Sequence, residues 1–205
     1  MKKIVCLIAL CLAAFSLQAQ GNMSYSLELV AGAGVGRGPQ FTVTPEFVAQ
    51  YQWDGGFRTG LGAGIRYARP VVSYTVKNGK HTHSSFCNEL DIPVFMRIGY
   101  GKGKLFTNLD AGYAFGILSF YDAGWVPGGE KAPSYNGIFC EPQFGWKLGQ
   151  YSSLALGVLL QQSTLMDHTV TESGTFGSSD YTETDRGIGH TIFTPAITLR
   201  YGFLF

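Results

Sequence analysis

The chain has 205 residues, of which only 14% are charged and 14% are aromatic, and it carries 28 glycines. Its formal net charge of +1 gives no electrostatic basis for binding nucleic acid or a strongly acidic ligand. Few charges together with many aromatic side chains indicate contact with lipid instead, and we expect no nucleic-acid partner.

The first 20 residues are predicted to be a cleaved signal peptide. Lys2 and Lys3 precede an apolar run from Ile4 to Phe15, and the small residue Ala19 follows. This order is typical of a secretory signal. The run is too short to span a bilayer as a helix, which needs about 20 apolar residues. We therefore expect residues 1–20 to be removed and residues 21–205 to form one exported domain without a transmembrane helix.

Segments in which apolar and polar residues alternate recur about eight times along the rest of the chain. Between residues 40 and 52 the apolar side chains occupy the odd positions and the polar ones the even positions, with Val48 as an exception. The segment from Phe57 to Tyr67 divides in the same way. This pattern is typical of roughly 10-residue membrane strands that face lipid on one side and a polar interior on the other.

Short and long connections alternate between these segments. Tight turns are predicted at residues 53–56, 101–104 and 149–152, and longer connections around residues 68–85, 119–135 and 163–188. Short turns at one end and long loops at the other are the topology of an outer-membrane barrel. An even number of strands then places both mature termini at the short-turn, periplasmic end.

The hairpin formed by the third and fourth segments allows a prediction of its register. Residues 77–80 read Lys-Asn-Gly-Lys, a two-residue type I′ turn. Paired positions should therefore sum to 78+79=157. This register places Leu61 opposite Met96 on the apolar face and Arg66 opposite Asp91 on the polar face, an opposite-charge pair. The two strands are expected to run about 20 residues each, by the length of the alternating pattern.

The chain ends in a strand whose alternate residues are apolar. Leu199, Tyr201, Phe203 and Phe205 share one face. A chain that ends this way resembles the small bacterial outer-membrane β-barrels. This resemblance implies that the terminal aromatic residue is the signal that the barrel-assembly machinery reads. The run from Glu89 to Val94, Glu-Leu-Asp-Ile-Pro-Val, is similar to the acidic, Ile-Pro-containing strand of PorT-like outer membrane proteins.

These features predict an all-β fold, a transmembrane antiparallel up-and-down β-barrel of eight strands, resembling the OmpA/OmpX-like barrels over residues 21–205. The expected location is the bacterial outer membrane with periplasmic termini. The expected partners are outer-membrane lipid, lipopolysaccharide and the barrel-assembly machinery. A soluble lipocalin-like barrel is the alternative, and it requires apolar side chains inside and polar ones outside.

Strand parity predicts a charged interior. The inward-facing acidic and basic residues are Glu28, Glu46, Arg58, Arg66, Glu89, Asp91, Arg97, Asp110, Glu141, Lys147 and Arg200. An eight-stranded barrel is just wide enough for side chains to fill it. We therefore expect these groups to form a hydrogen-bonded ionic network that closes the barrel. A narrow pore or small-solute channel through the network is the alternative.

No catalytic, metal or cofactor site is expected. His81 and His83 could share one side of a strand, but two ligands do not make a metal site. His83, Ser85 and Glu89 resemble the His-x-Ser pattern of a lipid A deacylase. Parity places them inward, whereas a lipid-cleaving site should face the bilayer. An outer-leaflet lipid-modifying enzyme therefore stays as an alternative to the non-enzymatic interpretation.

The remaining cysteines and loops complete the sequence-based interpretation. Cys87 is predicted to face inward and Cys140 outward, so two free thiols are expected rather than a disulfide. Tyr121 and Trp125 precede a Pro-Gly-Gly turn in a long loop and are candidates for binding an extracellular protein. The leading function is a non-enzymatic barrel that displays its loops for a structural or surface-interaction role.

Overall fold

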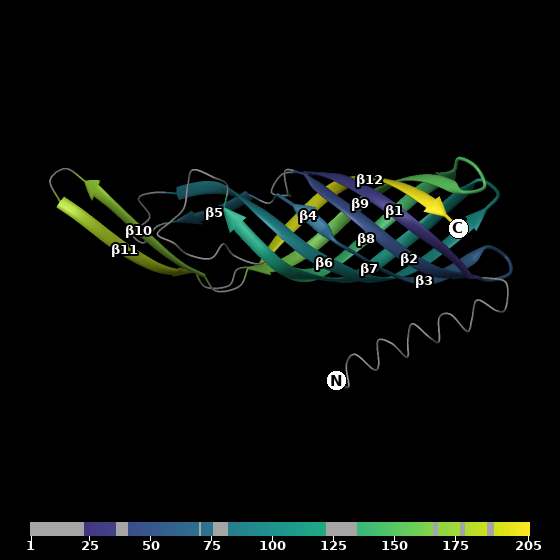
Figure 1. The fold of residues 1–205 in the computed structure, drawn as a ribbon, viewed down its shortest axis with the longest axis horizontal. Helices are drawn as coiled ribbons and strands as arrows, with labels where there is room; N and C mark the ends of the chain where they lie inside the picture. Colours follow the sequence, from purple (N-terminus) through teal and green to yellow (C-terminus); the bar gives the residue numbers. More distant parts are fainter. Residues whose placement is uncertain are drawn as a thin grey trace, which may run out of the picture.

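The structure, a computed structural model, describes residues 23–35, 41–69, 71–75, 82–121, 135–165, 168–176, 179–187 and 191–205. Eight staves form one antiparallel barrel (Figure 1). In chain order they are β1 (Met23–Gly34), β2 (Thr42–Gln52), β3 (Phe57–Gly64) continued by β4 (Arg66–Ala68), β6 (Thr82–Lys102), β7 (Leu105–Tyr121), β8 (Tyr135–Lys147), β9 (Ser152–Leu165) and β12 (Thr191–Leu204). The predicted eight-stranded all-β architecture is confirmed.

The barrel is closed by its first and last strands. β1 pairs with β2 on one side and with β12 on the other, over the register Ser26–Leu204 to Gly34–Ala196. Closure leaves no open sheet edge, which is the condition for a sheet to lie in lipid. Three further strands lie outside the ring of staves: β5 (Val71–Thr75) pairs with the start of β6, and β10 (His168–Phe176) pairs with β11 (Ser179–Gly187) beyond the barrel end opposite the C-terminus (Figure 1).

The predicted register between the third stave and β6 is confirmed. Phe57 lies opposite Tyr100, Leu61 opposite Met96 and Arg66 opposite Asp91, so each pair sums to 157. The turn at residues 77–80 itself lies outside the described residues. The predicted length of about 20 residues per strand is confirmed for β6, which has 21 residues, but the third strand is divided into β3, β4 and β5. Ile65 divides β3 from β4 while its N–H still donates to the Pro45 carbonyl at 3.1 Å, and residue 70, before β5, is a proline, which has no N–H to donate to a ladder.

Short turns and the C-terminus lie at one end of the barrel, which we call the short-turn end. Gly55 and Gly56 between β2 and β3 have φ of 89° and 94°, and Gly103 between β6 and β7 has φ of 65°. Residues with a side chain rarely adopt a positive φ, so glycine is favoured at these positions. Residues 25 and 205 join through hydrogen bonds from Tyr25 N to Phe205 O (3.2 Å) and from Phe205 N to Tyr25 O (3.0 Å).

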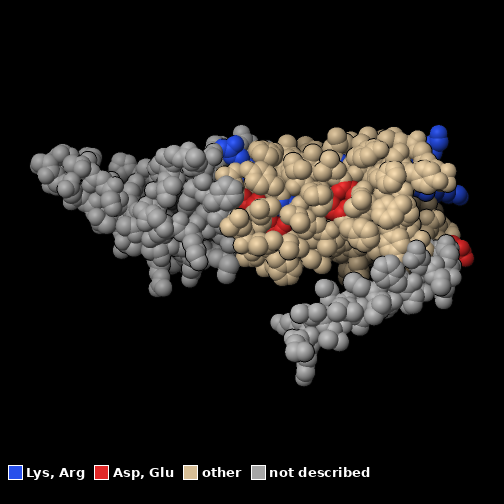
Figure 2. Space-filling model, in the orientation of Figure 1, with Lys and Arg blue, Asp and Glu red and all other residues tan. Residues whose placement is uncertain are grey.

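Exposure alternates along most of the stave length, with apolar side chains outside. Leu61, Met96 and Ile138 are 52%, 62% and 60% exposed, whereas the inward residues Gly62, Arg97 and Phe139 that follow them are buried. The visible flank of the barrel is mostly uncharged, and Lys and Arg side chains gather mainly at its ends (Figure 2). This is the opposite of the pattern required by a soluble lipocalin-like barrel. Within the described ranges there is no helix that is both long and apolar enough to cross a membrane.

Candidate functional site: the buried ionic network

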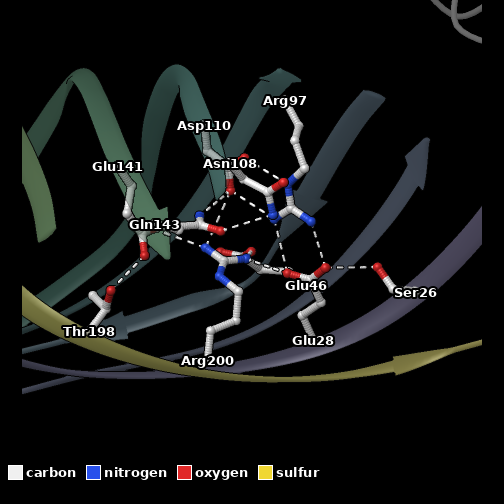
Figure 3. A network of polar contacts seen from close by, with 10 residues as sticks. All are labelled: Ser26, Glu28, Glu46, Arg97, Asn108, Asp110, Glu141, Gln143, Thr198 and Arg200. Atoms are coloured by element: carbon white, nitrogen blue, oxygen red, sulfur yellow. Dashed lines mark hydrogen bonds and ion pairs between the residues drawn. The ribbon is translucent and has the colours of Figure 1, made fainter. Parts of the chain in front are cut away.

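Charged side chains from six staves meet inside the barrel (Figure 3). We call this group the ionic network; it consists of Glu28 (β1), Glu46 (β2), Arg97 (β6), Asp110 (β7), Glu141 (β8) and Arg200 (β12). All six side chains are buried. A buried charge is costly unless it is paired and hydrogen-bonded, so the contacts of each member decide whether this interior is stable.

Arg97 holds two carboxylates from different strands. Its Nη1 and Nη2 donate to Glu28 Oε1 (2.6 Å) and Oε2 (2.9 Å). Its Nε and Nη2 donate to Asp110 Oδ1 (2.7 Å) and Oδ2 (2.8 Å). Both contacts use the planar guanidinium fork, which matches a carboxylate better than a lysine ammonium does. Arg97 therefore links β1 to β7 across the interior.

Arg200 is the second centre of the network. Its Nη1 donates to Glu28 Oε2 at 2.6 Å and also to Glu46. Its Nη2 donates to Glu141 Oε2 at 3.0 Å and lies 3.4 Å from Asp110 Oδ2. Arg200 thus contacts every carboxylate of the ionic network, which makes it the residue on which the largest number of buried negative charges depends.

Neutral side chains supply the remaining donors. Ser26 Oγ donates to Glu28 Oε1 (2.8 Å), Thr198 Oγ1 to Glu141 Oε1 (2.6 Å) and Gln143 Nε2 to Asp110 Oδ2 (2.7 Å). These donors matter because four carboxylates face only two guanidinium groups in the network.

An apolar layer lies next to the ionic network. It is a cluster of buried residues: Val48, Phe95, Ala114, Phe139, Leu159 and Ala196. The Phe95 and Phe139 ring centroids are 6.2 Å apart at an interplanar angle of 68°, an edge-to-face contact of the kind that stabilises aromatic pairs. The Arg97 guanidinium lies 5.7 Å from the Phe95 centroid. Polar and apolar side chains therefore occupy successive levels of the interior.

The predicted cross-strand pair lies on the other side of the apolar layer. Arg66 Nε donates to Asp91 Oδ2 at 2.9 Å, and Arg66 Nη2 is 2.9 Å from the same oxygen. The Arg66 guanidinium lies 6.0 Å from the Phe139 ring centroid. The aromatic pair is thus contacted by one arginine at each end.

Gly62 has no side chain, and the Phe95 ring occupies the space that a side chain there would fill. A Cβ at Gly62 would lie 2.3 Å from Phe95 Cζ and 2.5 Å from its Cε2. We predict that Gly62→Ala lowers the free energy of unfolding by about 1–3 kcal/mol, the usual cost of overpacking. In a Phe95→Leu background the same substitution should cost less, because the shorter side chain ends before the added methyl group. Urea unfolding of the wild type, the two single variants and the double variant tests this, and equal costs in both backgrounds would contradict it.

The structure does not bring the whole predicted interior set into the network. Arg58 and Lys147 lie toward the short-turn end, where both line a cavity. Glu89 is buried on β6 opposite Ala68, beyond the Arg66–Asp91 pair. The predicted assembly residues Leu199, Tyr201, Phe203 and Phe205 are exposed on the outer face of the last strand and its end.

The neutral side chains that surround the ionic network were missed by sequence reasoning, although a simple signal could have found them. They are Ser26, Gln143 and Thr198, together with Asn108, whose Nδ2 donates to Gln143 Oε1 at 3.4 Å. Each lies two positions from a charged residue of the network on the same strand. Side chains two apart in a strand share a face, so strand parity alone would have included them.

Several predicted features fall outside what the structure describes. His81, Trp125 and the side chains of His83, Ser85, Cys87 and Tyr121 are among them. Cys140 is a partly exposed free cysteine. Among the described residues, no group of three or more His, Cys, Asp or Glu side chains is arranged to hold a metal ion.

The sequence matches no protein-family model, and comparison with curated proteins gives no match either. Solved structures do resemble the fold. The outer membrane protein OprG from Pseudomonas aeruginosa is 10% identical with a TM-score of 0.49, covering 90% of this chain and 96% of its own. Neisserial surface protein A is 8% identical with a TM-score of 0.44, covering 88% and 94%. The E. coli outer membrane protein W is 11% identical with a TM-score of 0.35, covering 90% and 97%.

The chain has the fold of the small outer-membrane barrels. Closure of the eight staves, short turns at one end and an apolar outer face confirm the predicted resemblance at the level of the fold.

Proposed function

We propose that this chain is a closed, non-enzymatic barrel of the bacterial outer membrane that holds its long loops at the cell surface for a structural or surface-interaction role. The observation that carries the proposal is the filled interior, in which the ionic network and the apolar layer follow one another along the barrel.

The outer surface supports the membrane location. Large apolar side chains on neighbouring staves are exposed, for example Leu61 on β3, Met96 on β6 and Leu109 on β7. Aromatic residues form ring contacts on the same surface toward the short-turn end, including Tyr51 with Trp53 and Phe144 with Trp146. Aromatic girdles of this kind mark the membrane interface of outer-membrane barrels. Outer-membrane lipid and lipopolysaccharide are the partners that fit this surface.

The topology supports an orientation. In outer-membrane barrels the short turns face the periplasm. This rule would place Phe205 and the start of β1 in the periplasm, where the face formed by Leu199, Tyr201 and Phe203 is available to the barrel-assembly machinery.

A filled interior opposes ion flow. A conducted ion would have to separate the carboxylates held by Arg97 and Arg200, then cross a layer closed by the Phe95 and Phe139 rings. Separating a buried pair leaves uncompensated charge, and an apolar constriction blocks ions by excluding water.

Reconstitution in a planar bilayer tests the closed barrel. We expect no conductance steps from the wild-type chain. A Phe95→Gly/Phe139→Gly double variant, which removes both rings from the apolar layer, should show conductance steps or a leak current. A Leu109→Ala variant on the outer face serves as the matched control and should stay silent. Regular steps from the wild type would instead support the narrow-pore alternative.

A further inference from the structure

A cavity opens at the short-turn end on the far side of the ionic network from the apolar layer. We call it the end cavity. Residues from all eight staves line it, among them Gln50, Arg58, Asn108, Lys147, Ser153 and Arg200. The space open to the centre of a water molecule is about 20 Å³. Because this measure counts only the centre, the cavity itself is larger and can hold a small oxyanion or a few waters.

Arg58 is the main unexplained charge in the end cavity. The residue is buried, with only 6% of its surface exposed. Within the described part of the chain, its Nε and Nη2 have no hydrogen-bond partner. The guanidinium lies 5.0 Å from the centroid of the Phe106 ring, and a Cβ at Gly101 would lie 2.9 Å from Nη2. The Arg58 guanidinium is thus packed against Phe106 and Gly101, while its Nε and Nη2 donors are unused.

Other unpaired groups surround the same cavity. Across the described ranges, the buried polar atoms without a partner include Gln50 Oε1, Asn108 Oδ1 and Arg200 Nε, all on residues that line the cavity. Two of these atoms are acceptors and one is a donor. An unmade hydrogen bond in the interior is costly, so a ligand that satisfies this set needs both acceptor and donor atoms.

We infer that the end cavity is a binding site for inorganic phosphate. Phosphate oxygens accept from the Arg58 fork, and the Lys147 charge adds to the attraction. At neutral pH inorganic phosphate also keeps at least one hydroxyl group, which can donate to Gln50 Oε1 or Asn108 Oδ1. Sulfate and phosphodiester groups, including the phosphodiester of a phospholipid, have no hydroxyl group on sulfur or phosphorus and leave those acceptors unpaired.

The nearby carboxylate does not oppose this assignment. Glu28 lines the cavity, but its oxygens already accept from Arg97, Arg200 and Ser26. When Arg58 and Lys147 are counted with the ionic network, four cationic side chains balance four carboxylates. The anion therefore enters a part of the barrel that is formally neutral and is lined by the residues that carry the unused donors.

Titration calorimetry of the full chain, folded in a phosphate-free maltoside detergent, tests the site with inorganic phosphate as the probe. We expect saturable binding at neutral pH, and binding of sulfate and of dimethyl phosphate at least tenfold weaker. Arg58→Gln should weaken phosphate binding at least tenfold, and Arg58→Lys, which keeps the charge without the fork, should give an intermediate affinity.

Lys104→Gln supplies the matched control, because Lys104 is an exposed residue of a turn at the same end. Its phosphate affinity should equal that of the wild type. Retained heat-modifiable migration on gels would show that each variant is folded. The inference is overturned if wild-type protein shows no saturable phosphate binding, if sulfate binds equally well, or if folded Arg58→Gln protein binds phosphate like the wild type.

Discussion

Replacing Arg200 by methionine is expected to lower the free energy of unfolding by about 3–5 kcal/mol, the cost of leaving buried charges without their partner. Arg200 contacts Glu28, Glu46, Asp110 and Glu141. Without it, Glu46 and Glu141 lose their cationic partner, and Arg97 alone pairs with Glu28 and Asp110. Methionine keeps much of the side-chain volume, so the change reports on charge rather than on a cavity. Reversible urea unfolding in lipid vesicles measures the loss.

Two further variants separate this effect from a general loss of stability. Lys102→Met removes a positive charge from an exposed position beside a turn and should change stability by less than about 0.5 kcal/mol. Arg200→Met combined with Glu46→Gln should recover part of the loss, because one of the unpaired charges is removed. A loss below about 1 kcal/mol for Arg200→Met would contradict the role assigned to the ionic network.

The face of each interior residue could be predicted from the sequence, and so could some of its neighbours. A side-chain period of two decides that Arg97 points inward, and a type I′ turn fixes the register that places Arg66 opposite Asp91. That pair is 2.9 Å apart in the structure. Contacts along the wall of a barrel follow from pairing alone, so this part of the site was accessible without coordinates.

Contacts across the interior of the barrel could not be predicted from strand pairing in the same way. Arg97 and Glu28 are 69 residues apart and lie on strands that do not pair with each other. Their meeting depends on strand tilt and on the stagger of the closed barrel, which a local pattern does not contain. The sequence therefore predicted the charged set but not its division into the ionic network, the Arg66–Asp91 pair and the two cations at the short-turn end.

The glycines show why the network fits where it does. A Cβ at Gly157 would lie 2.6 Å from Thr198 Oγ1 and 2.7 Å from Glu141 Oε1. The side chains of the network thus use space that a neighbouring strand leaves free. Alternation marks Gly157 as inward-facing, but only the register across three strands shows which side chain occupies the space.

Placing an arginine at Met96 is expected to destabilise the barrel by about 2–4 kcal/mol if the outer face lies in lipid, because a charge near the bilayer midplane is costly. Met96 is 62% exposed, on the outer face between Leu61 and Ala111. Tyr100 lies four residues further along β6, roughly 13 Å nearer the short-turn end, beside Phe57. Tyr100→Arg should cost only about 0–1 kcal/mol, as expected near the interface.

The difference between these two sites distinguishes a membrane barrel from a soluble one. In water both positions are exposed, and a surface substitution at either would change stability by less than about 0.5 kcal/mol. In lipid the cost depends on depth, so Met96→Arg must exceed Tyr100→Arg by at least about 1 kcal/mol. Urea unfolding in vesicles gives both values. Equal and small costs would show that the apolar outer face is not in contact with hydrocarbon and would overturn the proposed membrane location.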